Sequence, residues 1–395
     1  MKRRVLIIST YYHPVIGGVE IHARQLVQHL HARGFSVEVV TKRTSLEHPA
    51  TETVDEVVVH RIGPIGERRA SGKWVILPTL FATLLRLGSR FDVLVCVDYR
   101  GIGIAAIAAA AVLRKPVIAQ GEVAGVLAGA VDGSNSGVPP ESDTTKILKA
   151  PARLIYKRAD AVACIGRDLE TEAIRAGVAK ARVHYLPHGV DMERFRPAQP
   201  GERDDLRRQL GWPTDRSVVL FVGRLSVEKG VLDLLEAWRV AKRGTALLVL
   251  VGPDMTGHPW DAGMPGRTFV SAHHLTESVR FVGAATDPAP YYRAADLLVQ
   301  PSHFEALGNT AIEAMASGLP VVSSGVGGLG DFCLDGINAL LHLPRSPESL
   351  ARAIETLLAD TALRTRLGEA ARRSAVEQFE INALMDRYAS LVEAV

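Results

Sequence analysis

The stretch SVVLFVGRLSVEKGVLDLLEAWRVA, residues 217–241, decides the fold class. It begins with a run of apolar, mainly β-branched residues, passes through a loop between Gly223 and Gly230, and continues with apolar residues at helical spacing. A strand without polar alternation followed by such a helix is one βα unit of a parallel sheet that is buried on both faces. The stretch therefore predicts an α/β protein with helices on both sides of a parallel sheet.

The same alternation of strands and helices extends in both directions from this stretch. Before it, we expect strands and helices at residues 5–9, 19–33, 36–41, 57–62, 93–97, 102–113, 117–119, 147–159, 161–165 and 183–186. After it, the pattern continues at residues 246–251, 279–282, 297–300, 309–317 and 321–323, and helices fill 347–395. The predicted fold is therefore α/β, with two Rossmann-like, doubly wound parallel-sheet domains facing a central cleft.

A break in this pattern predicts the domain boundary. Residues 197–201 are rich in proline and glycine, and the strongly charged residues 202–210 follow them. Such a composition is typical of a connection between domains. We therefore expect a first domain over residues 1–196 and a second over residues 197–376 of the 395-residue chain.

Composition excludes several classes of protein. Hydrophobic residues make up 47% of the chain, so it can bury a large core and is neither disordered nor fibrous. The three cysteines are far apart, which excludes a disulfide scaffold or a thiolate zinc site and favours a reduced, cytoplasmic compartment. The longest apolar run, residues 102–113, is shorter than the roughly 20 residues that a membrane-spanning helix needs.

The net charge of +3 hides an uneven distribution. Residues 1–196 hold 27 lysines and arginines against 19 acidic residues, or +8, whereas the remainder holds 19 against 24, or −5. The basic half either meets an anionic ligand or surface, or is an uneven but solvated surface. The segment 67–90, in which Arg68, Arg69 and Lys73 precede the apolar run that begins at Trp74, fits either a helix lying on the inner face of an anionic membrane or a core-facing helix with a basic rim.

Two loops are suited to an anionic ligand. Gly17 and Gly18 lie between the first strand and its helix, where backbone amides can approach a phosphate. In the loop 223–230, Arg224 and Lys229 could grip a diphosphate, the first as a planar fork and the second as a point charge. The loop is not a P-loop, because its glycine follows the lysine.

Two glutamates, Glu305 and Glu313, lie eight residues apart around the predicted start of a helix. At that start, the amides of Gly308, Asn309 and Thr310 offer a further anion site. Glu313 lies within the helix and could accept two hydrogen bonds from a ribose diol. The pattern therefore indicates a nucleotide ligand.

Four motifs, in this order, resemble the retaining glycosyltransferases of family 4. They are Gly17-Gly18-Val19-Glu20, His188-Gly189-Val190-Asp191, the loop 223–230, and residues 301–320 with their E-x7-E pattern. The resemblance covers nearly the whole chain and implies the GT-B fold. It also implies transfer of a sugar from a nucleotide-sugar to an unidentified acceptor, which could be lipid-linked, a saccharide or a small molecule. A UDP-sugar is favoured and a GDP-sugar is the second choice.

The resemblance also implies a role for each matching residue. Glu305, Arg224 and Lys229 would be catalytic, with the two cations on the donor diphosphate and the glutamate on the sugar hydroxyls. Glu313 would hold the ribose, and residues 377–395 would cross back onto the first domain. The remaining donor-binding groups would be Gly17, Gly18 and the amides of Leu307, Gly308, Asn309 and Thr310.

The chain departs from the family pattern at several positions. Gln120 stands where many members have histidine, so a histidine-dependent step does not transfer, although Gln120 could still bond the donor sugar. Glu122 could face the acceptor. Asp331 stands where family members commonly have glutamate, and the aspartate side chain is the shorter of the two. His188 stands where asparagine is common.

We expect no metal and no cofactor, because no Asp-x-Asp motif occurs in the chain. Nucleic acid is not an expected partner. Alternatives are a catalytically silent GT-B binding scaffold and a nucleotide-sugar epimerase on the same fold. A less favoured one is an NAD-dependent enzyme, because Gly101-Ile-Gly-Ile-Ala-Ala106, with Glu122 downstream, imitates the dinucleotide fingerprint.

Overall fold

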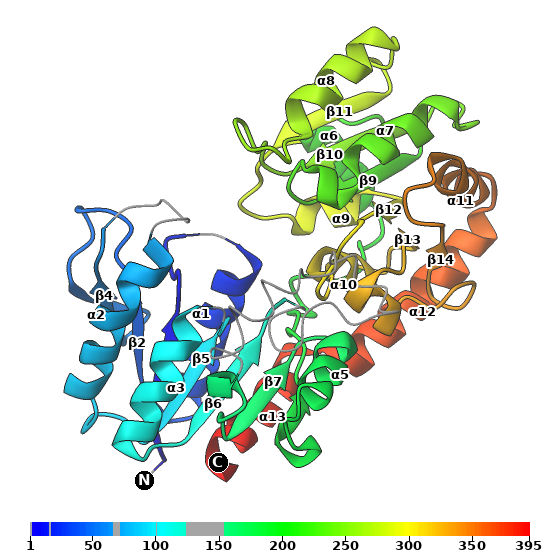
Figure 1. Ribbon diagram of the computed structural model, residues 1–395. Helices are drawn as coiled ribbons and strands as arrows, with labels where there is room; N and C mark the ends of the chain where they lie inside the picture. Colours follow the sequence, from blue (N-terminus) through cyan, green and yellow to red (C-terminus); the bar gives the residue numbers. More distant parts are fainter. Residues whose placement is uncertain (1, 16, 66–71, 100, 124–153) are drawn as a thin grey trace. The chain divides into compact units, whose positions relative to one another are not determined.

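The computed structural model describes residues 2–15, 17–65, 72–99, 101–123 and 154–395, which form two compact units (Figure 1). Unit 1 holds the described residues up to Gly189 together with Asn382–Val395, and unit 2 holds Val190–Ile381. The first boundary thus lies seven residues before the position that composition suggested. The chain returns to unit 1 at Asn382, five residues after residue 377, where the return was expected.

Among the described residues, unit 1 contains one eight-stranded sheet with the order β3-β4-β2-β1-β5-β6-β7-β8. All neighbouring strands are parallel except β3 and β4. The strands are β1 (Arg4–Ser9), β2 (Ser36–Lys42), β3 (Thr51–Val54), β4 (Val57–Ile62), β5 (Val93–Val97), β6 (Val117–Gly121), β7 (Ala161–Cys164) and β8 (Val183–Tyr185). Its longer helices are α1 (Gly18–Ala32), α2 (Gly72–Arg86), α3 (Ile102–Leu113), α5 (Arg167–Arg175) and the C-terminal α13 (Ile381–Ala394).

Unit 2 contains a six-stranded parallel sheet with the order β11-β10-β9-β12-β13-β14. The strands are β9 (Val218–Val222), β10 (Leu247–Val251), β11 (Val279–Gly283), β12 (Leu297–Gln300), β13 (Val321–Ser323) and β14 (Leu340–Leu341). Its helices are α6 (Glu202–Gln209), α7 (Val231–Val240), α8 (Gly263–Ala272), α9 (Ala289–Ala294), α10 (Asn309–Ala316), α11 (Pro347–Ala359) and α12 (Thr361–Phe379). Two short 3-10 segments, η2 (Val227–Lys229) and η3 (Gly327–Asp331), follow β9 and β13.

Burial explains why the apolar runs form central strands. Every residue of β9, β10 and β12 is buried, so these strands have no face for water. Trp238 of α7 is fully buried in the same hydrophobic core as Phe221 of β9. Two parallel sheets confirm the predicted fold class, and each sheet brings the carboxyl ends of its parallel strands to one edge.

The structure differs from the sequence prediction in a few elements. The charged stretch expected to be a connection is the helix α6, whose first turn carries three acidic residues and whose last turn carries Arg207 and Arg208. This order matches the helix dipole, so the charges favour the helix. The antiparallel edge strand β3 was not predicted, because its residues are polar and exposed or half-buried.

Helix α2 buries its apolar face within unit 1. Ile76, Leu80 and Leu84 are buried, while Val75 and Leu85 are exposed. This burial supports the core-facing interpretation for the described part of the segment. The predicted basic residues Arg68, Arg69 and the side chain of Lys73 lie outside the described part of the chain, as do the side chain of Trp74 and most of the helix predicted at 147–159.

The C-terminal helix is fixed to unit 1 by polar contacts. Arg33 and Asp386 form an ion pair with Nε–Oδ1 at 2.5 Å, and Arg387 donates to the carbonyl of Tyr185 at 2.7 Å.

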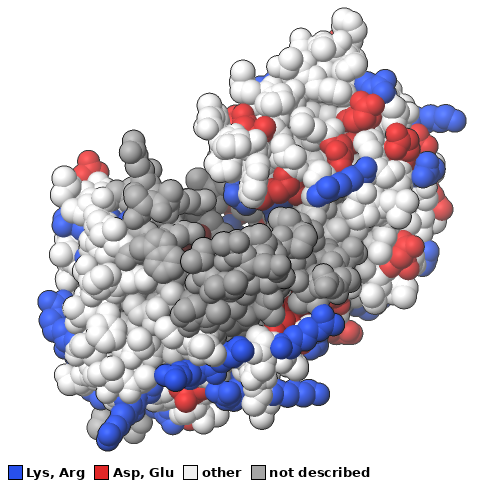
Figure 2. Space-filling view, viewed as in Figure 1, with Lys and Arg blue, Asp and Glu red and all other residues white. Residues whose placement is uncertain are grey.

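Figure 2 shows lysine and arginine side chains gathered along the margin of unit 1 near the N-terminus of the chain. Within the described ranges, every helix is too short or too polar to cross a membrane.

Candidate active site

The predicted diphosphate loop follows β9 at the carboxyl edge of the sheet in unit 2. Gly230 ends the short η2 segment with a φ of +69°, and a Cβ added there would lie 2.1 Å from the carbonyl oxygen of Pro301. Only glycine tolerates both the backbone conformation and this close approach. The loop is thereby held against the segment that follows β12, which places Lys229 beside the E-x7-E region.

Glu305 is the centre of a dense polar network. Its Oε2 atom accepts hydrogen bonds from three side chains, namely Lys229 Nζ at 2.7 Å, Gln300 Nε2 at 3.1 Å and Ser302 Oγ at 3.1 Å. Thr310 Oγ1 donates to Gln300 Oε1 at 2.8 Å, which fixes the orientation of that amide. The network orients the Glu305 carboxylate with one oxygen fully engaged, so its other oxygen is the one suited to a ligand hydroxyl.

The loop that carries Glu305 is supported by close backbone packing. A Cβ added to Gly327 would lie 2.0 Å from the Glu305 carbonyl oxygen, and one added to Gly328 would lie 2.4 Å from that of Ala306. The Gly328 amide donates to the Glu305 carbonyl at 3.1 Å. Asp331, which ends this supporting segment η3, is partly buried. The segment therefore acts on Glu305 by holding its backbone.

The helix α10 begins directly after this loop. Gly308 caps it with a φ of +98°, and the buried Leu307 precedes the cap. The first amides of a helix have no partner within the helix and favour an anion. Asn309 and Thr310 stand at this start, beside the Lys229–Glu305 pair, so the predicted amide group and the predicted cation lie together.

Glu313 occupies the next turn of α10 and has a buried partner. The Tyr292 hydroxyl donates to Glu313 Oε2 at 2.7 Å, and Tyr292 is fully buried. Loss of hydration raises the pKa of Glu313 to about 7, although Tyr292 and the Arg194 charge act in the opposite direction. Burial therefore favours the protonated form of Glu313 more than it would for a glutamate in water.

Arg224 is less constrained than Lys229. Its guanidinium forms an ion pair with Glu228, four residues further along the same loop, and 47% of its side chain is exposed. The Glu228 side chain is only 17% exposed, whereas the guanidinium of Arg224 lies at the surface, where a ligand can reach it.

The glycines predicted in unit 1 lie at the carboxyl edge of that sheet. Gly17 caps α1 with an extended backbone, and an added Cβ would lie 2.2 Å from Glu20 Oε2. Gly18 opens the helix and is exposed, which is the position expected of a backbone anion site.

Two family models match the chain. Glycosyl transferases group 1 matches residues 202–374, and glycosyltransferase family 4 matches residues 16–194. The D-inositol 3-phosphate glycosyltransferase of Kineococcus radiotolerans is 31% identical over 94% of this chain and 91% of that protein. The chain belongs to family 4 of the glycosyltransferases. An uncharacterized glycosyltransferase of Methanocaldococcus jannaschii is 27% identical to it over 95% of this chain and 94% of that protein.

Solved structures show that this glycosyltransferase has the GT-B fold. The sucrose-phosphate synthase of Thermosynechococcus elongatus is 27% identical and matches with a TM-score of 0.82 over 100% of this chain and 99% of that chain. The Anabaena protein HepE, solved in complex with UDP-glucose, matches in fold with a TM-score of 0.79 at 20% identity over all of both chains.

The fingerprint that suggested an NAD enzyme has a packing role in this glycosyltransferase. Gly103 lies inside α3, where an added Cβ would approach the Tyr99 Cβ to 2.8 Å and the Tyr156 ring to 3.0 Å. Gly101 caps the helix with a φ of +77°. Its glycines are therefore explained by helix packing, and the family match takes the place of the NAD interpretation.

Gln120 and Glu122 lie in a buried polar cluster of unit 1. Glu122 Oε2 is 3.0 Å from His188 Nε2, the Gln120 amide donates to Glu122, and the His22 and His188 rings stack at 4.1 Å. Burial acts to raise the pKa of Glu122, but His188, which is hydrogen-bonded to it, and the neighbouring His22 and Gln120 bring that pKa below its usual range. Burial lowers the pKa of His22 to about 3. Both Gln120 and Glu122 are buried, and their proposed role on the acceptor or sugar side stays a prediction.

The residue types of this cluster are also those of metal sites. Ligand atoms of His22, Glu122 and His188 all lie within 4.8 Å of one another. The two rings are inclined by only 15°, so their in-plane lone pairs do not converge on a common point. A tetrahedral ion would need such convergence, and the hydrogen-bonded Glu122–His188 pair describes the observed geometry better.

Proposed function

We propose that this glycosyltransferase moves a sugar from a nucleotide-sugar to an acceptor hydroxyl with retention of anomeric configuration. A UDP-sugar is the favoured donor and a GDP-sugar the second choice, and no metal or other cofactor takes part. The observation that carries the proposal is the group formed by Lys229, Glu305 and the start of α10, with Glu313 one turn further on.

Each group in this set fits one part of a nucleotide-sugar. Lys229 and Arg224 would neutralise the diphosphate together with the amides at the start of α10. Glu313 would accept hydrogen bonds from the ribose diol, and Glu305 would accept them from the sugar. The complex of HepE with UDP-glucose supports this assignment, since the two proteins share their fold.

The reaction follows from the same groups. The bond between C1 of the sugar and the diphosphate oxygen breaks, and a bond forms between C1 and the acceptor oxygen on the same face. The acceptor proton passes to a β-phosphate oxygen of the leaving group, so no protein base is required. Preorganised cations and amides stabilise the charge that develops on the diphosphate, which is usually a large part of catalysis.

A peripheral contact with an anionic membrane through the basic unit 1 is a further part of the proposal. It rests on the charge of +8 over residues 1–196 and on the basic margin in Figure 2. If the protein does not co-sediment with phosphatidylglycerol vesicles at low salt, the proposed membrane contact is wrong.

A thermal-shift screen of UDP- and GDP-sugars tests the proposed donor site. A ligand at 100 times its Kd stabilises the folded state by about 2.7 kcal/mol, so the true donor should stand out from the others. Lys229→Ala should remove this stabilisation, whereas Lys242→Ala, an exposed lysine outside the site, should retain it. A donor that stabilises Lys229→Ala as strongly as the parent chain would refute the assignment.

A further inference from the structure

Unit 2 holds a cavity away from the candidate active site. Its volume is about 480 Å³, and it lies between α12, the start of α6 and the turn at Gly318. Asp296 and Pro320 line it, and they directly precede β12 and β13. Glu305 and its network follow the other ends of these parallel strands, so the cavity opens at the opposite edge of the sheet.

Close packing between a helix and a turn builds the floor of the cavity. Gly368 of α12 is buried, and an added Cβ would lie 2.4 Å from the carbonyl oxygen of Gly318. Gly318 has a φ of +74°. The cavity therefore belongs to the packed structure of the unit. Its volume falls within the range of small-molecule sites and exceeds what a phosphate ion needs.

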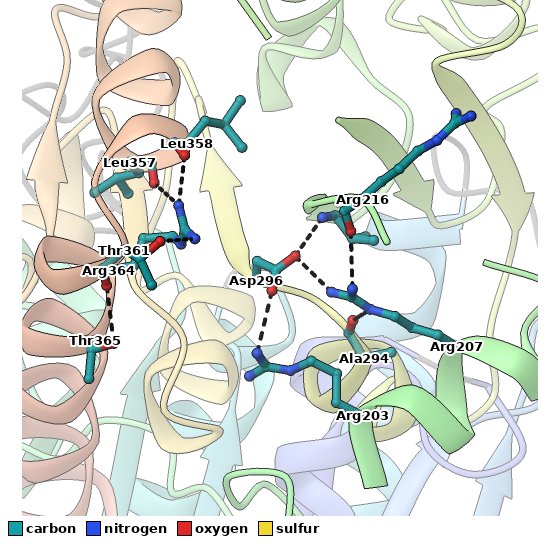
Figure 3. A network of polar contacts seen from close by, with 11 residues as sticks. Arg203, Arg207, Arg216, Ala294, Asp296, Leu357, Leu358, Thr361, Arg364 and Thr365 are labelled. Atoms are coloured by element: carbon teal, nitrogen blue, oxygen red, sulfur yellow. Dashed lines mark hydrogen bonds and ion pairs between the residues drawn. The ribbon is translucent and has the colours of Figure 1, made fainter. Parts of the chain in front are cut away.

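The charged side chains that line the cavity form one wall, in which arginines outnumber carboxylates. Four arginines line the cavity against two acidic residues, and the set consists of Arg203, Arg364, Arg372, Arg373, Asp296 and Glu369. Asp296 is already engaged, since Oδ2 lies 2.7 Å from Arg207 and Oδ1 lies 3.4 Å from Arg203 (Figure 3). The wall thus carries a net positive charge.

Two of these arginines are oriented by neutral groups. Arg364 donates to the carbonyl of Leu358 at 2.9 Å and to Thr361 Oγ1 at 2.8 Å (Figure 3). Arg372 donates to the carbonyls of Phe195 at 2.9 Å and Ala316 at 2.6 Å. Carbonyl oxygens hold a guanidinium in place without cancelling its charge, so both groups add fixed positive charge to the wall of the cavity.

Hydroxyl and carboxylate groups lie beside this charge. Thr361, Thr365 and Glu369 occupy successive turns of α12 on the face that lines the cavity. Such groups exchange hydrogen bonds with the hydroxyls of a polyol, whereas guanidinium groups prefer phosphate. We propose that this cavity binds a phosphorylated sugar or polyol, with the phosphate on the arginines and the hydroxyls on the threonines and Glu369.

Isothermal titration calorimetry of the full chain with glucose 6-phosphate tests the proposal, with glucose as the phosphate-free comparison. We expect saturable binding of glucose 6-phosphate and at least about tenfold weaker binding of glucose, because the phosphate supplies the charge-assisted bonds. The double variant Arg203→Glu/Arg373→Glu changes two exposed side chains of the wall and should lower the affinity at least about tenfold.

Two further variants separate this cavity from general charge and from the donor site. Lys242→Glu/Arg352→Glu makes the same change in net charge at exposed positions outside the cavity and should retain the affinity of the parent chain. Lys229→Ala should also retain it. Equal affinity in the wall variant and its charge-matched control, or loss of binding in Lys229→Ala, would overturn the proposal.

Discussion

At the scale of single residues, the pair Tyr292–Glu313 sets the electrostatics of the proposed ribose site. Glu313 can accept two strong hydrogen bonds from a diol as a carboxylate, and it loses part of this capacity when protonated. Its pKa of about 7 in the free protein lies well above that of a solvated glutamate, because burial disfavours the charge. We therefore expect donor binding at the proposed site to depend on pH in the neutral range.

Tyr292→Phe should move this pH dependence. In the parent chain, the KM for the donor should rise as the pH falls through about 7, since protonated Glu313 accumulates on that side. The Tyr292 hydroxyl lowers the pKa of Glu313 by donating to it, so its removal should shift the midpoint to higher pH. Measurement of KM and kcat between pH 5.5 and 8.5, on the order of three units around that pKa, checks this.

Tyr291→Phe is the matched control for that prediction. Tyr291 is the preceding residue of α9, and its ring lies 5.8 Å from that of Trp212. The same loss of one hydroxyl there should leave the midpoint unchanged. Identical pH profiles for Tyr292→Phe and Tyr291→Phe would show that the hydroxyl of Tyr292 does not control Glu313.

The residues of the site were only partly predictable. Glu305, Glu313, Arg224 and Lys229 stand out because charged side chains follow apolar strands. Tyr292 and Gln300 do not, because each acts through a hydrogen bond to a glutamate elsewhere, 21 residues away for Tyr292. A tyrosine in a short helix carries no local sign of such a partner, so this part of the network required the folded structure.

At the scale of secondary structure, the decisive element is the short η2 segment between β9 and α7. Its position depends on Gly230, which combines a left-handed backbone with a close approach to Pro301. Lys229 immediately precedes this glycine, so any displacement of the backbone moves the ammonium group away from Glu305.

Gly230→Ala should therefore destabilise the protein and weaken donor binding. Gly244→Ala is a suitable comparison, because Gly244 also has a positive φ, +57°, but an added Cβ there meets no atom within 4 Å. Both variants carry the left-handed backbone cost of about 1–2 kcal/mol. The additional clash in Gly230→Ala should cost about 1–3 kcal/mol more in the free energy of unfolding, which denaturant titration measures. Equal losses in the two variants would contradict the role of the close approach.

Strands were more predictable than helices at this scale. The apolar runs of β9, β10 and β12 match the structure closely, since a strand buried on both faces leaves a continuous signal. The helices α5, α6, α8 and α9 were not predicted. They are short or strongly charged, and tertiary packing decides them more than local sequence does.

At the scale of the whole molecule, the two units carry opposite charge. Arg224 and Lys229, the two cations proposed to bind the diphosphate, lie in the second part of the chain, which is acidic overall. Their positive charge is therefore local and opposite to the net charge of the unit that carries them. The boundary between the units was placed by composition to within seven residues of the structural one. A charged helix was interpreted as part of the connection, which accounts for part of the difference.

The most direct test of the proposed function is NMR of donor turnover in the presence of EDTA. The protein is incubated with UDP- and GDP-sugars, with water as a slow substitute for the unidentified acceptor, and the first anomer of the released sugar is recorded before mutarotation. We predict release of the nucleoside diphosphate without a metal, and a released sugar with the anomeric configuration of the donor. Release of the opposite anomer would contradict retention, and turnover that stops with EDTA and returns with Mg²⁺ would contradict the metal-independent mechanism.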